Sequence, residues 1–216
     1  VPELLGILPL KNTVLYPGVV IPITVGRDKS IALVKEAYAS PDRLVGVIAQ
    51  RNMHIEDPEP SDLFRFGTLA RIIKLIRMPD GSITIVIQGR ARFEVGEFVQ
   101  EEPYFKARVH KLTEEYPTKK ESQVLVRSMK REAQQIIEIS PNIPTEAQVV
   151  LQNITSLTFL VYFIASNLNL EIQDKQSILE MNSLLIKGHQ VLGLMGKELA
   201  ILELSEEIHS KVKTDL

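Results

Sequence analysis

The sequence contains no cysteine, which excludes disulfide bonds, thiolate metal ligands and cysteine nucleophiles. It also has no uninterrupted apolar run of the roughly 20 residues that a membrane-spanning helix needs. The first residues lack the basic-then-apolar layout of a secretory signal peptide. We therefore expect no membrane partner, and the cytoplasm is the expected location.

Sequence motifs that carry catalysis are missing as well. There is no Walker-type phosphate loop, no glycine-rich dinucleotide fingerprint and no GxSxG nucleophile elbow. The four histidines are scattered and form no HExxH pair, and the acidic residues of segment 56–62 are interleaved with prolines, which favours an exposed loop over a cation site. We therefore predict no catalytic residue, no cofactor and no metal site within this chain.

The chain has no excess of charge of one sign. It carries 25 basic and 27 acidic residues, a net charge of -2 and a pI of about 6.2, whereas nucleic-acid binders usually present a basic face. One segment gathers basic residues without paired aromatic residues for base stacking, which favours ordinary sheet-face charges: Arg71, Lys74, Arg77, Arg90 and Arg92. We therefore do not expect a nucleic-acid partner.

Glycine and proline are unevenly distributed. Eight of the eleven glycines lie at or before Gly96, none falls between residues 97 and 187, and no proline follows Pro144. Such a shift in helix breakers indicates β structure first and helices afterwards. We predict an α+β chain with a β-rich domain at residues 1–116 and a helical domain at residues 117–216.

Strand patterns are clearest in residues 82–88, where isoleucine occupies every second position. A period of two indicates a strand with one buried face. Met78-Pro79-Asp80-Gly81 separates this segment from residues 69–76, which predicts a hairpin. Further strands are expected at residues 91–95 and 104–112. About six strands in all predict a small barrel or a strongly coiled sheet.

The opening of the chain carries a turn. Tyr16-Pro17-Gly18 combines a proline, which restricts φ, with a glycine, which accepts conformations that other residues avoid. Pro22 lies in the following apolar run and cannot donate a ladder hydrogen bond, so that strand should be an edge or carry a bulge. Residues 29–39 are predicted to form a helix with Asp28 as its cap.

Helices are expected throughout the second half, at residues 121–139, 145–151 and 157–166. Pro141 and Pro144 should separate the first two, and Thr145 with Gln148 resembles a capping box. The final segment, residues 174–212, contains no proline and would extend for roughly 55–60 Å as one helix. Its three glycines, at positions 188, 193 and 196, favour a bend.

The end of this last segment carries an apolar stripe at helical spacing, formed by Ile201, Leu204, Ile208 and Val212. The earlier part has local helices on which to dock, but the later part lacks enough partners to bury the stripe. We therefore predict an arm that packs on another segment or subunit.

Several short segments, taken in order, carry a family resemblance. They are Leu8-Pro9-Leu10, Val14-Leu15-Tyr16-Pro17-Gly18, Val25-Gly26-Arg27, Ile48-Ala49-Gln50, Phe66-Gly67-Thr68-Leu69-Ala70 and Gln88-Gly89-Arg90-Ala91-Arg92-Phe93. Together they resemble the N-terminal region of Lon, the ATP-dependent serine protease family of bacteria and organelles. The resemblance covers essentially the whole chain.

The resemblance implies a PUA-like β domain followed by an α-helical bundle that ends in a long helix, the start of a coiled-coil arm. It also implies a hexameric parent enzyme that uses ATP and Mg and whose catalytic Ser-Lys dyad lies outside this chain. The chain would then be a non-catalytic N-terminal fragment of a protein in the bacterial cytoplasm or, alternatively, the mitochondrial matrix. The matched positions resemble fold determinants rather than contact residues: Pro9, Tyr16, Pro17, Gly18, Pro22, Gly67, Gly89 and Arg92.

Our hypothesis from the sequence is that this fragment recognises unfolded, damaged or degron-bearing proteins and supports hexamer assembly and substrate delivery. Exposed apolar surface and flexible arms would be its physical means; an edge strand could add a peptide strand, and shallow apolar pockets could take its side chains. The candidate contact residues are Tyr16 and Pro17 in the first turn, Met78 and Pro79 in the hairpin turn, and Met195, Leu199 and Leu202 on the arm. Two alternatives stay open: a mainly structural oligomerisation scaffold, and a PUA-like module that binds RNA or a small ligand.

Overall fold

A computed structural model describes residues 1–140 and 143–215, and it divides the chain into two compact units. The first unit comprises Val1–Thr113 and Glu171–Glu180, and the second comprises Glu114–Leu170 and Met181–Leu216. This division differs from the predicted one chiefly in the short helix within residues 171–180, which belongs with the strands. The predicted helix break at Pro141 lies outside the described residues.

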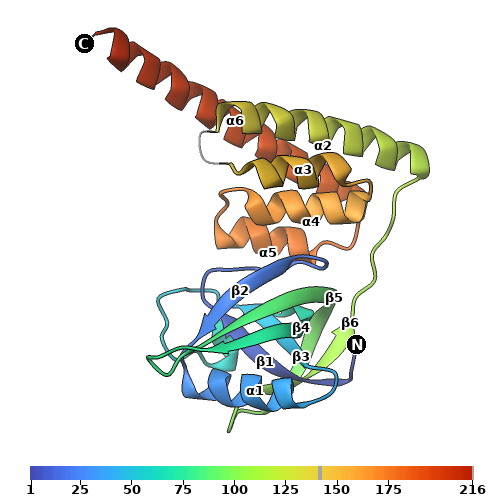
Figure 1. Cartoon of the computed structure of the whole chain (residues 1–216). Coiled ribbons are helices and arrows are strands. Elements are labelled where there is room, and N and C mark those ends of the chain that lie inside the picture. The colour runs from blue at the N-terminus through green and yellow to red at the C-terminus, as the bar shows by residue number, and fades with distance from the viewer. Residues whose placement is uncertain (141–142, 216) are drawn as a thin grey trace. The chain divides into compact units, whose positions relative to one another are not determined.

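The first unit is a six-stranded sheet with two helices (Figure 1). Its elements are β1 (Leu4–Leu10), β2 (Val20–Val25), α1 (Asp28–Ala39), β3 (Leu44–Ala49), the 3₁₀ turn Pro60–Asp62, β4 (Phe66–Arg77), β5 (Ile83–Gln100), β6 (Lys106–Lys111) and α5 (Ile172–Glu180). The strand order is β2-β5-β4-β3-β1-β6, and β6 also pairs with the second half of β5. This pairing closes a small barrel, as predicted, with β2 outside the closed ring.

Alternating residues build the wall of this barrel. Ile83, Ile85 and Ile87 are buried, whereas Thr84 and Val86 between them are half-buried. The predicted hairpin between β4 and β5 is confirmed, because the Gly81 N–H donates to the Met78 carbonyl (3.1 Å) and Gly81 has a φ of 88°. Glycine suits this position because other residues rarely adopt a positive φ.

The first turn and the edge strand also follow the sequence. The Val19 N–H donates to the Tyr16 carbonyl (3.2 Å), and Gly18 has a φ of 81°, as in a type II turn with Pro17 at its second position. Pro22 lies in β2, which pairs with β5 alone among the described strands, so the predicted edge is confirmed. The predicted cap of α1 is wrong: Asp28 is the first helical residue and Arg27 is the N-cap.

The second unit is a bundle of four helices, α2 (Lys119–Ile139), α3 (Thr145–Asn153), α4 (Leu157–Asn167) and α6 (Leu184–Thr214). The predicted bounds of α2, α3 and α4 are confirmed to within two residues. The capping box lies elsewhere than predicted: Pro144 is the N-cap of α3, and the reciprocal bonds join Thr118 and Glu121 at the start of α2. The Thr118 hydroxyl lowers the pKa of the Glu121 carboxyl by hydrogen bonding.

The final segment is two helices rather than one continuous helix. Residues 181–183 separate α5 from α6, and the Ser183 hydroxyl accepts from the Ile186 N–H (3.3 Å) as the cap of α6. A side chain that satisfies an N–H group at a helix start stabilises a new helix there. From this start, α6 continues as one helix of 31 residues through all three glycines.

A buried polar cluster holds the second unit together. The Lys187 side chain is completely buried, and its Nζ lies 2.9 Å from Glu114 Oε1. The Tyr162 hydroxyl accepts from this amine and donates to the same carboxylate. Because an unpaired buried charge is costly, removal of one member should destabilise the bundle strongly.

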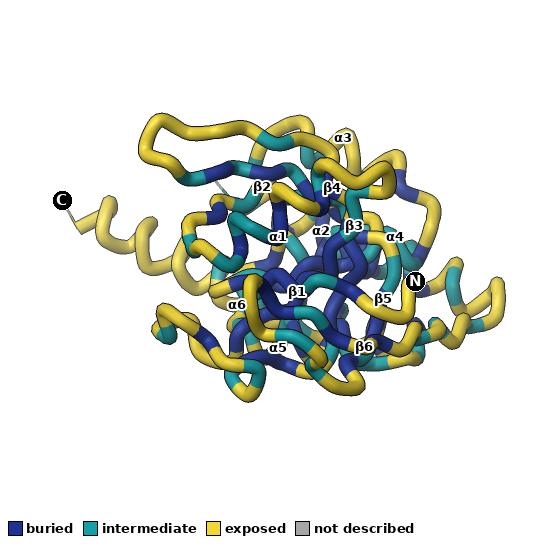
Figure 2. Tube along the Cα trace, turned by 90° about the horizontal axis from the view of Figure 1, so that it is seen from below, coloured by how far each residue is buried: buried dark blue, intermediate teal, exposed yellow. Residues whose placement is uncertain are grey.

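The last turns of α6 lie apart from this bundle, and almost every residue after Leu202 is exposed (Figure 2). Ile201, Leu204, Ile208 and Val212 are each at least half exposed. The stripe predicted from the sequence is therefore present and uncovered in the described structure. Within the described residues, none of the helices is both long and apolar enough to cross a bilayer.

Candidate peptide-binding surface

The segments that carried the resemblance meet in the first unit. The Gly18 N–H donates to the Gly89 carbonyl, and the Gly89 N–H donates to the Val19 carbonyl, both at 2.9 Å. A Cβ on Gly89 would lie 2.1 Å from the Tyr16 carbonyl oxygen. The turn at residues 16–18 therefore packs directly on β5, and only glycine leaves room for it.

Helix α5 is anchored on the strands by three side chains. The Tyr16 hydroxyl donates to the Lys175 carbonyl (2.8 Å), Arg92 Nη1 donates to the Leu179 carbonyl (2.9 Å), and Gln176 Nε2 donates to the Phe66 carbonyl (3.0 Å). All three side chains are almost completely buried, and burial raises the pKa of the Tyr16 phenol. Tyr16 and Arg92 therefore act in folding, in agreement with their interpretation as fold determinants.

A second pair of motif residues meets beside α1. The buried Gln50 side chain accepts from Arg27 Nη2 and donates to the carbonyl of Ile55 (2.9 Å). Burial lowers the pKa of the Arg27 guanidinium, and the carboxylates of Glu56 and Asp57 oppose this shift. Arg27 and Gln50 both belong to the opening segments, but their pairing joins residues 23 positions apart and could not be inferred from local pattern.

Three neighbouring strands present one solvent-facing surface. Directly paired residues of antiparallel strands share a face, and the register of β2, β5 and β4 defines three rows. We call these nine residues the ribbon face: Val20, Gln88 and Arg71; Pro22, Val86 and Lys74; Thr24, Thr84 and Ile76. The opposite face carries the buried isoleucines of β5, so the ribbon face lies on the outside of the barrel.

The ribbon face exposes apolar side chains that a solvent-facing sheet usually avoids. Val20 is 49% exposed and Ile76 is 40% exposed. An irregularity in the β4–β5 register between Ile72 and Lys74 turns Ile73 outward as well, and Met78 continues the series at the hairpin tip. The pairing of both β2 and β4 with β5 thus brings Val20, Ile73, Ile76 and Met78 to one ribbon.

The charges on this ribbon are of one sign. Residues 20–25 and 83–88 carry no charge, while the paired part of β4 carries Arg71, Lys74 and Arg77. None of these three cations has an ion-pair partner among residues 1–140 and 143–215. The surface therefore combines exposed apolar groups with positive charge.

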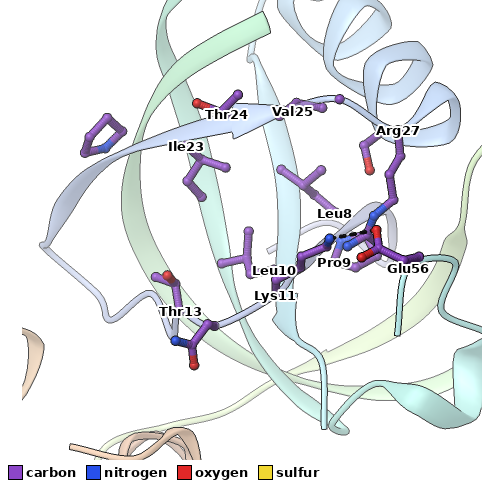
Figure 3. Close-up of a pocket in the computed structure, with 14 residues that line it drawn as sticks. Leu8, Pro9, Leu10, Lys11, Thr13, Ile23, Thr24, Val25, Arg27 and Glu56 are labelled. Carbon is purple, nitrogen blue, oxygen red and sulfur yellow. Dashed lines mark hydrogen bonds and ion pairs between the residues drawn. The ribbon is translucent and has the colours of Figure 1, made fainter. Parts of the chain in front are cut away.

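A pocket of about 600 Å³ lies beside the same edge strand (Figure 3). Ile23 of β2 and Leu8 and Leu10 of β1 line its apolar part, and Figure 3 shows these side chains directed into the space between the two strands. At its rim the Lys11 amine lies 3.0 Å from Glu56 Oε2, and the bond to Lys11 lowers the pKa of that carboxyl.

In the second unit, an apolar pocket of about 300 Å³ lies among the four helices and is lined by Met195 and by residues such as Ile136, Leu151 and Phe163. Met195 is completely buried, whereas Leu199 and Leu202 are half-buried. Among the described residues, no cluster of three or more histidine, aspartate or glutamate side chains is arranged to hold a metal ion.

The candidate contact residues therefore occupy different environments. Tyr16 and Met195 are core residues, so neither offers exposed surface, and Pro17 is half-buried. Met78 and Pro79 are exposed at the hairpin tip, and their role in contact stays a prediction. The sequence reasoning did not identify Val20, Ile73 and Ile76, because the strand register and its irregularity, rather than composition, place them outside. The available signal was the adjacent pair Ile72-Ile73, because consecutive residues of a regular strand point to opposite faces and one of the two had to face solvent.

The chain is similar to known proteins in both sequence and fold. Residues 5–197 match the family described as the ATP-dependent protease La (LON) substrate-binding domain. The chain is 46% identical over its whole length to Lon proteases of Cytophaga hutchinsonii and Flavobacterium johnsoniae, and it spans about a quarter of their length, 27% and 26% respectively.

A solved structure has the same fold. The N-terminal domain of a Lon protease from the Mycobacterium avium complex superposes with a TM-score of 0.70 over 90% of this chain and 98% of its own length, at 19% sequence identity. The family match over residues 5–197, which covers most of both units, shows to which family the chain belongs. The chain belongs to the family of Lon protease substrate-binding domains.

Proposed function

We propose that this chain binds unfolded, damaged or degron-bearing polypeptide segments through the ribbon face and delivers them to the protease of which such domains form a part. The observation that carries this proposal is the exposure of Val20 and Ile76 on the ribbon face and of Ile73 and Met78 beside it. An unfolded chain differs from a folded one by its accessible apolar side chains, and an exposed apolar surface can bind them. Proteolysis itself, with ATP and Mg and in a hexamer, is proposed for the longer protein.

The proposal is tested by titrating the 216-residue chain with a reduced, S-carboxymethylated protein and with the native form of the same protein. We expect saturable binding of the unfolded form alone. Ile76→Ser should weaken this binding about fivefold or more, because it removes an exposed apolar side chain from the contact. Val124→Ser is the matched control, since Val124 is 56% exposed on α2. Equal binding of both forms, or equal effects of both substitutions, contradicts the proposal.

A second function is favoured by the uncovered stripe on α6. We propose that Ile201, Leu204, Ile208 and Val212 pack on another subunit of the longer protein and support its assembly. Removal of residues 201–216 leaves both compact units with their cores, so it should abolish assembly of the longer protein without loss of the unfolded-protein binding of this chain. Sedimentation velocity measures the first effect, and the titration above measures the second. Unchanged assembly contradicts the scaffold role.

A further inference from the structure

The open edge of β2 presents a row of backbone groups. Pro22 lies opposite Val86, and because proline has no N–H, this pair must be of the non-hydrogen-bonded kind, with its polar groups directed away from the partner strand. Val20 and Thr24 lie two residues before and after Pro22, so their backbone N–H and carbonyl groups also point away from β5. The Val19 carbonyl, one residue before Val20, accepts from the Gly89 N–H on β5, as expected if the bonding direction alternates along the strand.

This edge therefore offers two N–H groups, of Val20 and Thr24, and three carbonyl groups, of Val20, Pro22 and Thr24. None of these five groups has a hydrogen-bond partner within the described part of the chain. They recur at every second residue, about 6.6–6.8 Å apart along the strand, which is the repeat of another extended backbone. The edge is thus complementary to an extended polypeptide rather than to a compact ligand.

The space beside this edge is an opening in the barrel wall. Residues 4–6 of β1 pair with β6 and the Ile7 N–H donates to the Phe105 carbonyl (2.8 Å), whereas residues 8–10 pair with β3 on one side only. Between these residues and β2 lies the pocket lined by Leu8, Leu10 and Ile23. A strand added to β2 would cover this pocket and direct every second side chain toward its apolar floor.

The polar groups at the rim do not favour a charged ligand. Lys11 is paired with Glu56, and Arg27 is bonded to Gln50. An ionic ligand would have to break these contacts, whereas an uncharged aliphatic side chain would occupy the pocket without disturbing them. The pocket is therefore suited to valine, isoleucine or leucine.

We propose that an extended segment of an unfolded protein binds as an additional strand at the open edge of β2, with uncharged aliphatic side chains in the pocket. This proposal rests on the proposed recognition of unfolded protein and specifies how the backbone is held. Main-chain hydrogen bonds to β2 would give the affinity for the bound segment, and every second side chain of that segment, placed in the pocket, would give the selectivity. At Pro22 the edge lacks an N–H, so an added strand can bond only the carbonyl of that residue.

A proline substitution tests the edge. Thr24 pairs with Thr84 in the same non-hydrogen-bonded manner as Pro22 with Val86, so Thr24→Pro removes an outward N–H and leaves the β5 ladder intact. We expect the affinity for a reduced, S-carboxymethylated protein to fall about fivefold. Thr24→Val is the matched control, because it retains the N–H, and its affinity should stay within twofold of the original.

A peptide series tests the same geometry on the unaltered chain. The probe is a labelled nine-residue peptide in which valine alternates with serine, with a lysine at each end. N-methylation of alternate residues removes the N–H groups from one edge of the extended peptide at a time. One methylated set should lose binding about tenfold or more, and the other should stay within twofold, because only one edge can face β2.

The outcomes separate this proposal from the one on which it rests. If unfolded protein binds but Thr24→Pro and both methylated sets leave affinity unchanged, strand addition is wrong and recognition through the ribbon face stands. Equal losses from the two methylated sets also refute strand addition. If unfolded protein does not bind the unaltered chain, the proposed recognition fails and strand addition fails with it.

Discussion

Substitution of Gly89 by alanine should destabilise the first unit strongly, although it adds a single methyl group. The added Cβ would lie 2.1 Å from the Tyr16 carbonyl oxygen and 2.9 Å from its carbon, whereas ordinary contacts begin at 3.4 Å. The contacted atoms are backbone atoms and cannot rotate away. The turn at residues 16–18 must therefore move by about 1.3 Å relative to β5.

The cost can be worked from this displacement. Overpacking of a filled site costs about 1–3 kcal/mol, and the two hydrogen bonds that join Gly89 to the turn contribute about 1 kcal/mol each when intact. If the turn retreats and weakens both bonds, the free energy of unfolding falls by about 3 kcal/mol. For a chain of this size, that corresponds to a fall in Tm of about 10 °C.

Differential scanning calorimetry of the chain measures the effect, with Gly26→Ala as control. A Cβ on Gly26 would meet nothing within 4 Å, so this substitution should change the free energy of unfolding by less than about 0.5 kcal/mol. The reasoning is refuted if Gly89→Ala changes Tm by less than about 2 °C, or if Gly26→Ala lowers Tm as much as Gly89→Ala does.

Three further predictions concern hydrogen bonds and charge. A lysine at position 92 cannot reach both carbonyls that the Arg92 guanidinium bonds, so Arg92→Lys should lower the free energy of unfolding by about 2 kcal/mol and speed amide exchange in α5. Unchanged exchange would contradict the anchoring of α5 by Arg92. Burial and the nearby Glu94 carboxylate raise the pKa of Glu180, while Arg51 opposes the shift. Because the folded chain then binds a proton more tightly than the unfolded chain, ionisation of Glu180 opposes folding above its folded pKa. Glu180→Gln should therefore raise Tm at about pH 7, and the gain should disappear near pH 4; a gain that persists at pH 4 rules out this cause. Thr118→Ala should cost the second unit about 1 kcal/mol in denaturant unfolding, whereas Thr118→Ser should retain the cap, and equal losses would contradict it.

Local patterns predicted much of the fold. The alternation in residues 82–88, the glycine at position 81 and the proline at position 22 predicted a strand, a hairpin and an edge, because each depends on the conformation or hydrogen bonding of only a few neighbouring residues. Helix caps were less predictable. Asp28 and Thr145 are suitable cap residues by type, but each is already the first helical residue, and the N-cap is the preceding residue, Arg27 or Pro144, whose backbone is extended.

The candidate site depended on contacts that no local pattern contains. The Gln176 side chain bonds the Phe66 carbonyl across 110 positions, so α5 joins the strands although the sequence placed it in the helical half. The ribbon face likewise exists because β2 pairs with β5 and an irregularity in β4 turns Ile73 outward. Strand and helix periods, turns and the family resemblance depend on neighbouring residues, so they could be predicted from the sequence. The docking of α5, the open barrel wall and the exposed apolar surface arise from register and packing between distant segments, so they become visible only in the folded chain.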